Sequence, residues 1–175
     1  SKGRQRMDIT KSKENDVKQE KSIVEDIRMD KKVLVKSIAN WITGAKRITT
    51  NGDISVPAKG SILLSREEII AQAQNGNTLL SGIDGLGSHA TWYVDDEFTR
   101  KELSFESEDN KQSILTFDEI KRIFSLKTPK SFEENIKEKV VTRAEKAYLL
   151  DCIKQQKIND YDRISFCIKY TGMKM

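Results

Sequence analysis

Residues 61–94, SILLSREEIIAQAQNGNTLLSGIDGLGSHATWYV, carry the densest secondary-structure signals in the chain. The apolar run Ile62-Leu63-Leu64, which follows Ser61, predicts a strand. Ser65 and Glu68 then have the spacing of a capping box, which predicts that a helix begins directly after the strand. Asn75-Gly76-Asn77 predicts its end, because Gly and Asn tolerate the left-handed conformation found at helix C-termini.

The second half of this stretch predicts two more strands. Thr78-Leu79-Leu80 is one apolar run, and residues 89–94 form the other, with alternating polar and apolar side chains. The glycines between them fall where a loop must reverse the chain. We therefore expect a unit of strand, helix and hairpin.

A second hairpin is predicted upstream. Asn51-Gly52 lies between residues 46–50 and 53–56, and Asn-Gly favours the two positive φ angles of a two-residue type I′ turn. Pro57 then ends the second strand, and Gly60 turns the chain into the stretch that begins at Ser61.

The N-terminal part of the sequence predicts an arm followed by helices. Residues 1–20 are mostly charged or amide-bearing and bury too little to offset their ordering entropy, so we expect a flexible charged arm. Such an arm either stays solvated or orders against a neighbouring subunit or nucleic acid. Residues 21–175 are expected to form a single domain. Apolar residues spaced by three and four across 17–43 predict one or two amphipathic helices, which Gly44 ends.

The C-terminal part predicts a helical cluster and a last strand. Three further Ser/Thr-to-Glu spacings predict helices over about residues 117–126, 132–140 and 143–156. Residues 164–170 alternate apolar and polar side chains, which predicts a final strand that returns to the sheet. Short strands are also expected at 101–105 and 113–115.

The predicted fold class is α+β. It has a small, mostly antiparallel sheet of about five to seven strands, an N-terminal helix and a C-terminal helical cluster.

Composition limits the function only broadly. The chain has 175 residues, 33% charged side chains and a formal net charge of +4, which permits nucleic acid or an acidic protein as partner. No apolar run reaches the roughly 18 residues that a membrane span needs, so we expect no membrane partner and a location in the cytoplasm or within a viral particle. Cys152 and Cys167 lack CxxC spacing and partner histidines, and are expected to be buried reduced thiols.

Three short motifs contain residue types that can carry chemistry. Tyr93-Val94-Asp95-Asp96 resembles the tetrapeptide in the palm of reverse transcriptases, where adjacent carboxylates hold two divalent metals. The resemblance covers four residues only and needs another aspartate on a neighbouring strand, which Asp53 could supply only by chance. The alternative is an acidic turn whose carboxylates are exposed to water.

The other two motifs lack the context that their chemistry requires. Residues 82–88 are as glycine-rich as a phosphate-binding loop, but a strand follows where a helix is required and no lysine is present. Asp84, Ser88 and His89 are the residue types of a nucleophilic triad, yet neighbouring residues of a strand point to opposite faces. His89 is the only histidine, and is expected to be a hydrogen-bonded turn residue. We predict no catalytic residue, cofactor or metal, and hence no enzyme.

Basic side chains are the remaining candidates for function. They occur on the hairpin and in the C-terminal helices, where glutamates interleave with lysines at helical spacing. The candidate contacts to nucleic acid or to a protein partner are Lys46, Arg47, Lys59, Lys121, Arg122, Lys130 and Arg143.

Two functions follow as predictions. The first is a non-enzymatic structural, assembly or protein-interaction component that engages protein partners or its own copies; the high Lys, Ile and Asn content suits a phage or mobile-element particle. The alternative is a basic nucleic-acid-binding accessory protein, which depends on the basic hairpin and helices.

Overall fold

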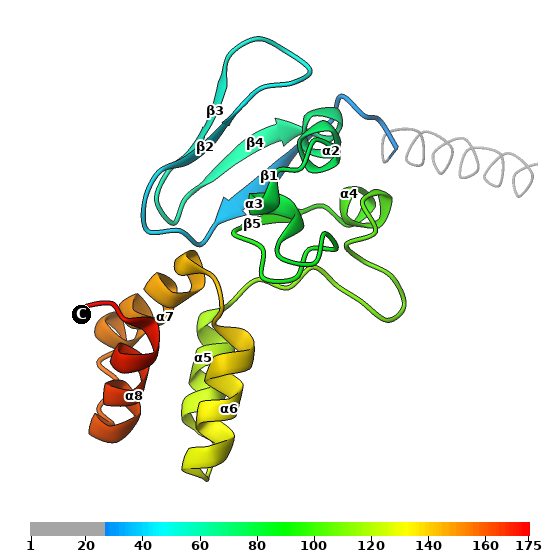
Figure 1. Cartoon of the computed structure of the whole chain (residues 1–175). Helices are drawn as coiled ribbons and strands as arrows, with labels where there is room; N and C mark the ends of the chain where they lie inside the picture. The colour runs from blue at the N-terminus through cyan, green and yellow to red at the C-terminus, as the bar shows by residue number, and fades with distance from the viewer. Residues whose placement is uncertain (1–26) are drawn as a thin grey trace, which may run out of the picture.

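A computed structural model describes residues 27–175, which form an α+β fold with two antiparallel sheets (Figure 1). The larger sheet has the strand order β4-β1-β5, with β1 at Lys32–Ser37, β4 at Ser61–Ser65 and β5 at Trp92–Asp95. The smaller sheet is the hairpin of β2 (Thr43–Lys46) and β3 (Asp53–Val56). The predicted α+β class with antiparallel strands is confirmed, and the strands are divided between two small sheets where a single sheet was expected. The predicted arm at 1–20 lies outside the described residues.

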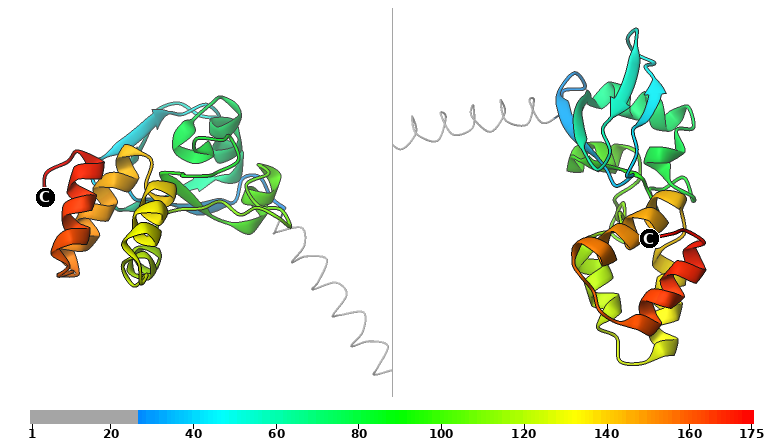
Figure 2. Two further views of the ribbon diagram at one scale, coloured as in Figure 1. Left: turned by 60° about the horizontal axis from the view of Figure 1, so that its bottom comes forward. Right: turned by 90° about the vertical axis from the view of Figure 1, so that its left-hand side faces the viewer.

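Helices cover two regions of the molecule. Three short ones pack near the sheets: α2 (Arg66–Gln74), α3 (Thr78–Ser81) and α4 (Glu97–Glu102). Four more form a separate cluster below the larger sheet in Figure 1: α5 (Phe117–Phe124), α6 (Pro129–Lys139), α7 (Arg143–Gln155) and α8 (Tyr161–Thr171). Figure 2 shows the same separation from two other directions. The C-terminal helical cluster is therefore confirmed.

Each region has its own hydrophobic cluster. The sheet cluster is built around Trp92 and Phe105, and the helical cluster around Phe132 and its neighbours. Ile38 and Ala39 follow β1 directly in the chain but are buried in the helical cluster. The end of the central strand is therefore packed into both halves of the molecule.

The helix predicted across 17–43 is wrong where the structure describes it, because residues 32–37 are the central strand β1. Val33 and Val35 are buried while Lys32 and Lys36 are exposed, which is the two-residue period of a strand. Leu34 is an apolar residue on the opposite face. Because it interrupts the alternation of apolar and polar residues, the sequence has the spacing of an amphipathic helix. Residues 17–26 lie outside the described residues.

The predicted final strand is also wrong, since residues 161–171 form α8. Its ends follow helix-capping rules: the Asp160 carboxylate accepts a hydrogen bond from the backbone N–H of Arg163, and Gly172 adopts the left-handed conformation. Phe166 and Tyr170, one turn apart, stack with ring centroids 6.0 Å apart. Alternation over residues 164–170 was a weaker signal than these caps.

Two other predicted strands are helical as well. Residues 78–80 belong to α3, because the Asn77 side chain accepts a hydrogen bond from the backbone N–H of Leu79 at 3.1 Å and caps a helical turn. Residues 101–105 begin within α4 and end in a turn, and Asp96 caps that helix. Residues 113–115 lie in none of the described strands.

Helix starts predicted from Ser or Thr are mostly correct. Thr116 caps α5, and the Thr142–Glu145 capping box of α7 is complete, with both reciprocal hydrogen bonds present. α6 begins earlier than the predicted 132: Thr128 is its cap, because Pro129 fits the first helical position, where no N–H is needed.

The hairpin is confirmed, but its turn is wider than predicted. Lys46 pairs with Asp53, and the Arg47 N–H donates to the carbonyl of Gly52 at 2.9 Å, so Asn51-Gly52 is not an isolated two-residue turn. Gly44 lies within β2, where an added Cβ would be 2.6 Å from the Ile54 carbonyl oxygen, so it serves close strand packing and ends no helix.

Glu68 explains the wide turn. Its carboxylate accepts hydrogen bonds from the backbone N–H groups of Ile48 and Thr49, at 3.1 and 3.2 Å, and from the Thr49 hydroxyl. The Glu68 side chain therefore holds the hairpin loop against α2, while its own N–H still donates to the Ser65 hydroxyl that caps α2.

Candidate functional site

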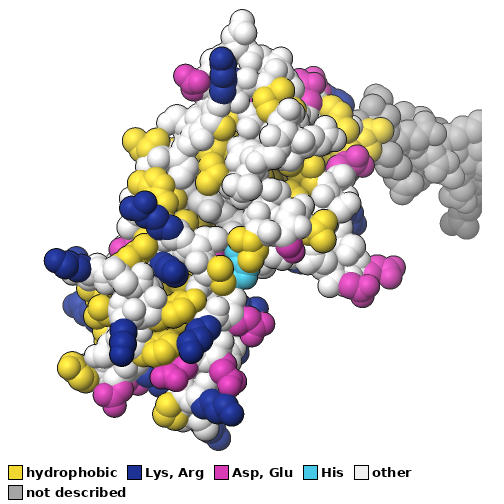
Figure 3. Space-filling model, viewed as in Figure 1, with side chains coloured by type: hydrophobic (Ala, Val, Ile, Leu, Met, Phe, Trp, Pro, Cys, Tyr) yellow, Lys and Arg dark blue, Asp and Glu magenta, His cyan; other side chains and the backbone are white. Residues whose placement is uncertain are grey.

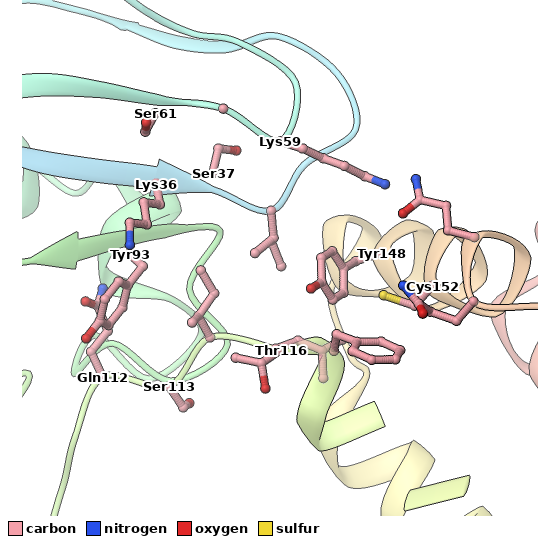
Figure 4. Close-up of a pocket in the computed structure, with 17 residues that line it drawn as sticks. Lys36, Ser37, Lys59, Ser61, Tyr93, Gln112, Ser113, Thr116, Tyr148 and Cys152 are labelled. Carbon is pink, nitrogen blue, oxygen red and sulfur yellow. The ribbon is translucent and has the colours of Figure 1, made fainter. Parts of the chain in front are cut away.

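A cleft of about 830 Å³ lies between the larger sheet and the helical cluster (Figure 4). Lys36, Ser61 and Tyr93 line it from the three strands. Phe117 and Tyr148 line it from α5 and α7. The cleft is thus the space where two separately packed halves of the molecule meet, and one side of it is the outward face of the sheet.

The strand register explains why that face is available. Val35 pairs with Ile62 and Val94 and points into the sheet cluster. The next residue, Lys36, pairs with Ser61 and Tyr93 and therefore points to the other face, toward the cleft.

The lysines at the cleft are paired with aspartates. Lys36 Nζ lies 3.3 Å from an Asp95 carboxylate oxygen, and Lys59 Nζ lies 2.7 Å from Asp151. Asn40 Nδ2 also donates to Asp151 at 3.3 Å. Positive charge at the cleft is therefore largely neutralised, and its lining is otherwise apolar or uncharged.

The Tyr148 hydroxyl and the Cys152 thiol of the cleft both have raised pKa values. Burial, together with the neighbouring Cys152, raises the pKa of Tyr148 to about 12. Burial also raises the pKa of the Cys152 thiol. A thiol needs a lowered pKa to act as a nucleophile at neutral pH, so this lining favours packing and hydrogen bonding over covalent chemistry.

His89 is a structural link between the two halves. It adopts a left-handed backbone conformation with φ 57°, and its Nδ1 lies 2.9 Å from each carboxylate oxygen of Glu145 at the start of α7. The Glu145 side chain is only 2% exposed and also accepts hydrogen bonds from the N–H groups of Val141 and Thr142. The prediction that His89 is a hydrogen-bonded turn residue is confirmed.

Asp84 and Ser88 are in contact, but among the described residues no hydrogen bond links either of them to the His89 imidazole. The Asp84 carboxylate accepts hydrogen bonds from the backbone N–H groups of Leu86 and Ser88, within its own loop. His89 turns instead to Glu145. Asp84 therefore shapes a glycine-rich turn and does not orient the imidazole.

The two adjacent aspartates also have separate partners. Asp96 accepts hydrogen bonds from Arg66 Nε at 2.9 Å and Nη2 at 3.1 Å, whereas Asp95 pairs with Lys36. Although burial acts to raise the pKa of Asp96, the hydrogen bonds from Arg66 and Thr99 lower it overall. The described residues contain no group of three His, Cys, Asp or Glu side chains that could hold a metal ion.

The seven predicted basic contacts do not form one site. Lys46 and Arg47 lie on the hairpin, Lys59 at the cleft, Lys121, Arg122 and Lys130 on or beside α5 and α6, and Arg143 at the start of α7. Arg122 Nη2 lies 2.8 Å from Glu119, and the Arg143 guanidinium lies over the Trp41 ring at 5.6 Å. Figure 3 shows basic and acidic side chains interspersed over the helical half.

Sequence reasoning missed the walls of the cleft. The sequence pattern predicts a helix at Lys36, and it predicts a strand at Tyr93 without indicating that this side chain faces a cleft. The signal that could have found them is the two-residue period of 32–37, whose outward positions continue across the sheet to Tyr93.

Comparisons with other proteins give no further guide to function. No helix within residues 27–175 has both the length and the apolar character that a membrane span needs. No protein-family model, curated protein or solved structure matches this chain.

Proposed function

We propose that this protein is a non-enzymatic structural or assembly component that binds a polypeptide partner through the cleft between its sheet and its helical cluster. The observation that carries the proposal is the cleft itself: about 830 Å³, lined by tyrosines, apolar side chains and amides, with its two lysines paired to aspartates.

A polypeptide fits this lining better than a phosphate chain does. Protein interfaces are enriched in aromatic side chains and depleted of lysine at their cores, and the cleft places Tyr93, Phe117 and Tyr148 around one space. Nucleic-acid binding depends on cations that neutralise phosphates, yet Lys36 and Lys59 already have carboxylate partners. The amino-acid composition favours a component of a phage or mobile-element particle.

Tyr93 offers a direct test, because the chain contains a matched control. Peptides selected from a random library on the immobilised protein should carry apolar anchors. Tyr93→Ala removes one wall of the cleft. It should lower the affinity of the selected peptides about tenfold, since an interface tyrosine commonly contributes more than about 1 kcal/mol. Tyr161, which is 82% exposed at the start of α8, lies away from the cleft, so Tyr161→Ala should leave the affinity unchanged.

Fluorescence anisotropy separates the two functions. Labelled single- and double-stranded oligonucleotides should show no binding at physiological salt. If they bind with a steep salt dependence while no selected peptide responds to Tyr93→Ala, the nucleic-acid alternative holds and the cleft proposal fails.

A further inference from the structure

We propose that two copies of this chain pair through the free edge of β4, in antiparallel orientation about a twofold axis at Leu63, to form one continuous sheet twice as wide. This pairing goes beyond the proposed cleft function: Leu63, at its centre, does not line the cleft, although Ser61 at the end of the same strand does.

The register shows which backbone groups of β4 are available. The Arg66 N–H donates to the Lys31 carbonyl at 2.9 Å, and the Ser37 N–H donates to the Gly60 carbonyl at 2.8 Å. Bonded pairs alternate in an antiparallel ladder, so Ile62 and Leu64 bond to β1. The N–H and C=O groups of Ser61 and Leu63 and the N–H of Ser65 therefore point away from the sheet.

These outward groups have no hydrogen-bond partner among the described residues. No ladder joins β4 to the β2–β3 hairpin, which instead buries Ile54 and Val56 in the sheet cluster. The Leu63 side chain is 57% exposed. Residues 61–65 contain neither a proline nor a charge, the usual devices that protect an edge from pairing.

The opposite edge of the same sheet is protected. The backbone N–H of Val94 on β5 donates to Gln112 Oε1 at 3.1 Å, and Gln112 Nε2 donates to the Trp92 carbonyl at 3.2 Å. Arg100 Nη1 donates to the Val94 carbonyl at 2.8 Å. Side chains thus occupy the place of a further strand at β5, whereas within residues 27–175 no ladder continues the sheet beyond β4.

A second copy is the occupant that β4 fits, because its sequence reads almost the same in both directions. With the axis at Leu63, Ser61 lies opposite Ser65 of the other copy, Ile62 opposite Leu64, and Leu63 opposite Leu63. On the outer face the Ser61 and Ser65 hydroxyls meet and Leu63 meets its counterpart, while Ile62 and Leu64 meet on the inner face. No like charges within 61–65 oppose each other, and the outward N–H and C=O groups become paired.

Cysteine cross-linking tests this register within the full chain. Leu63→Cys should be joined to itself by a short bifunctional thiol reagent, because directly opposed bonded residues have Cα atoms about 5.5 Å apart. Ser61→Cys is the matched control on the same strand: the two copies of residue 61 would be about 13 Å apart, four residues along the ladder, and should not react with each other. The native Cys152 and Cys167 are buried, which keeps the background low.

A charge at the axis provides the second measurement. In sedimentation equilibrium, Leu63→Lys should raise the dimer dissociation constant at least about tenfold, since two ammonium groups would face each other and an apolar contact would be lost. Ile42→Lys, at a 71% exposed position elsewhere, should leave it unchanged. A wild-type chain that stays monomeric, a dimer that Leu63→Lys does not weaken, or equal cross-linking at 61 and 63 would each overturn the pairing.

Discussion

Asp95 and Asp96 are adjacent in sequence but differ in what their carboxylates do. Asp95 makes an exposed ion pair with Lys36, whereas Asp96 is hydrogen-bonded to the guanidinium of Arg66, which is 2% exposed. Asp96→Asn should destabilise the protein by about 3 kcal/mol, because it removes the negative charge that accepts two hydrogen bonds from a buried guanidinium. Asp95→Asn should change stability by less than about 0.5 kcal/mol.

Urea denaturation of the two variants checks this difference. Magnesium or manganese should raise the melting temperature of neither the wild type nor Asp95→Asn. Equal effects of the two substitutions on stability, together with a metal-dependent shift that both abolish, would restore the metal-binding interpretation of this pair.

Glu68 should make folding stability depend on pH. Burial acts to raise its pKa, but hydrogen bonds from Gln72, Ile48 and Thr49 lower it below its ordinary value of 4.5. A group with a lowered folded pKa contributes stability above its unfolded pKa and loses it as the pH falls through the folded value. The contribution should therefore be complete at pH 6 to 7 and decline below about pH 4.5.

Glu68→Gln isolates this contribution. The substitution should cost about 1–3 kcal/mol at neutral pH, because a neutral amide cannot accept all of the loop hydrogen bonds. The difference in unfolding free energy between the wild type and Glu68→Gln should shrink between pH 5 and pH 3. A difference that is constant over this range would mean that the carboxylate charge plays no part.

Residue-level predictions succeeded where the cause was local. Thr116 and Thr142 cap helices because the hydroxyl needs only an N–H three residues away, and that spacing is visible in the sequence. Glu68 has the same spacing from Ser65, but its carboxylate is used by a loop about twenty residues earlier in the chain. A partner at such a distance leaves no mark on the local pattern.

At the scale of elements, the start of α7 combines two functions. Thr142 only caps the helix, while Glu145 completes the capping box and also binds His89 of the sheet half. Thr142→Ala should cost about 1 kcal/mol, the usual value for a lost N-cap. Glu145→Ala should cost at least about 2 kcal/mol, because it leaves buried N–H groups unpaired.

Chemical denaturation of both single variants and of His89→Ala tests this comparison. The effects of Glu145→Ala and His89→Ala should be non-additive in the double variant, since the two side chains share one contact. Additive effects would show that the contact does not contribute to stability.

Hydrophobic periodicity predicted the strands less accurately than capping residues predicted the helices. β1 was hidden because both of its faces carry apolar residues, Val35 inward and Leu34 outward. Residues 164–170 alternate like a strand, yet Asp160 and Gly172 fix the two ends of α8. Because a helix was predicted in place of β1, the cleft could not be predicted either. Lys36 lines the cleft only because it occupies an outward position of that strand.

At the scale of the whole molecule, the two hydrophobic clusters should unfold together. Ile38 and Ala39 connect the central strand to the helical cluster, and the pairs Lys59–Asp151 and His89–Glu145 cross the same junction. Near-ultraviolet circular dichroism, which reports on buried Trp92, and the far-ultraviolet helix signal should therefore give coincident melting curves. Two separate transitions would contradict the prediction of a single domain.

The position of Ile38 has a consequence for molecules that bind in the cleft. Ile38 is a lining residue of the cleft and a buried member of the helical cluster, and it follows directly on the central strand. An occupant that restricts it would slow amide hydrogen exchange in both halves at once, including in α8, which the occupant need not touch. Slower exchange in both halves would show that binding in the cleft stabilises the whole molecule.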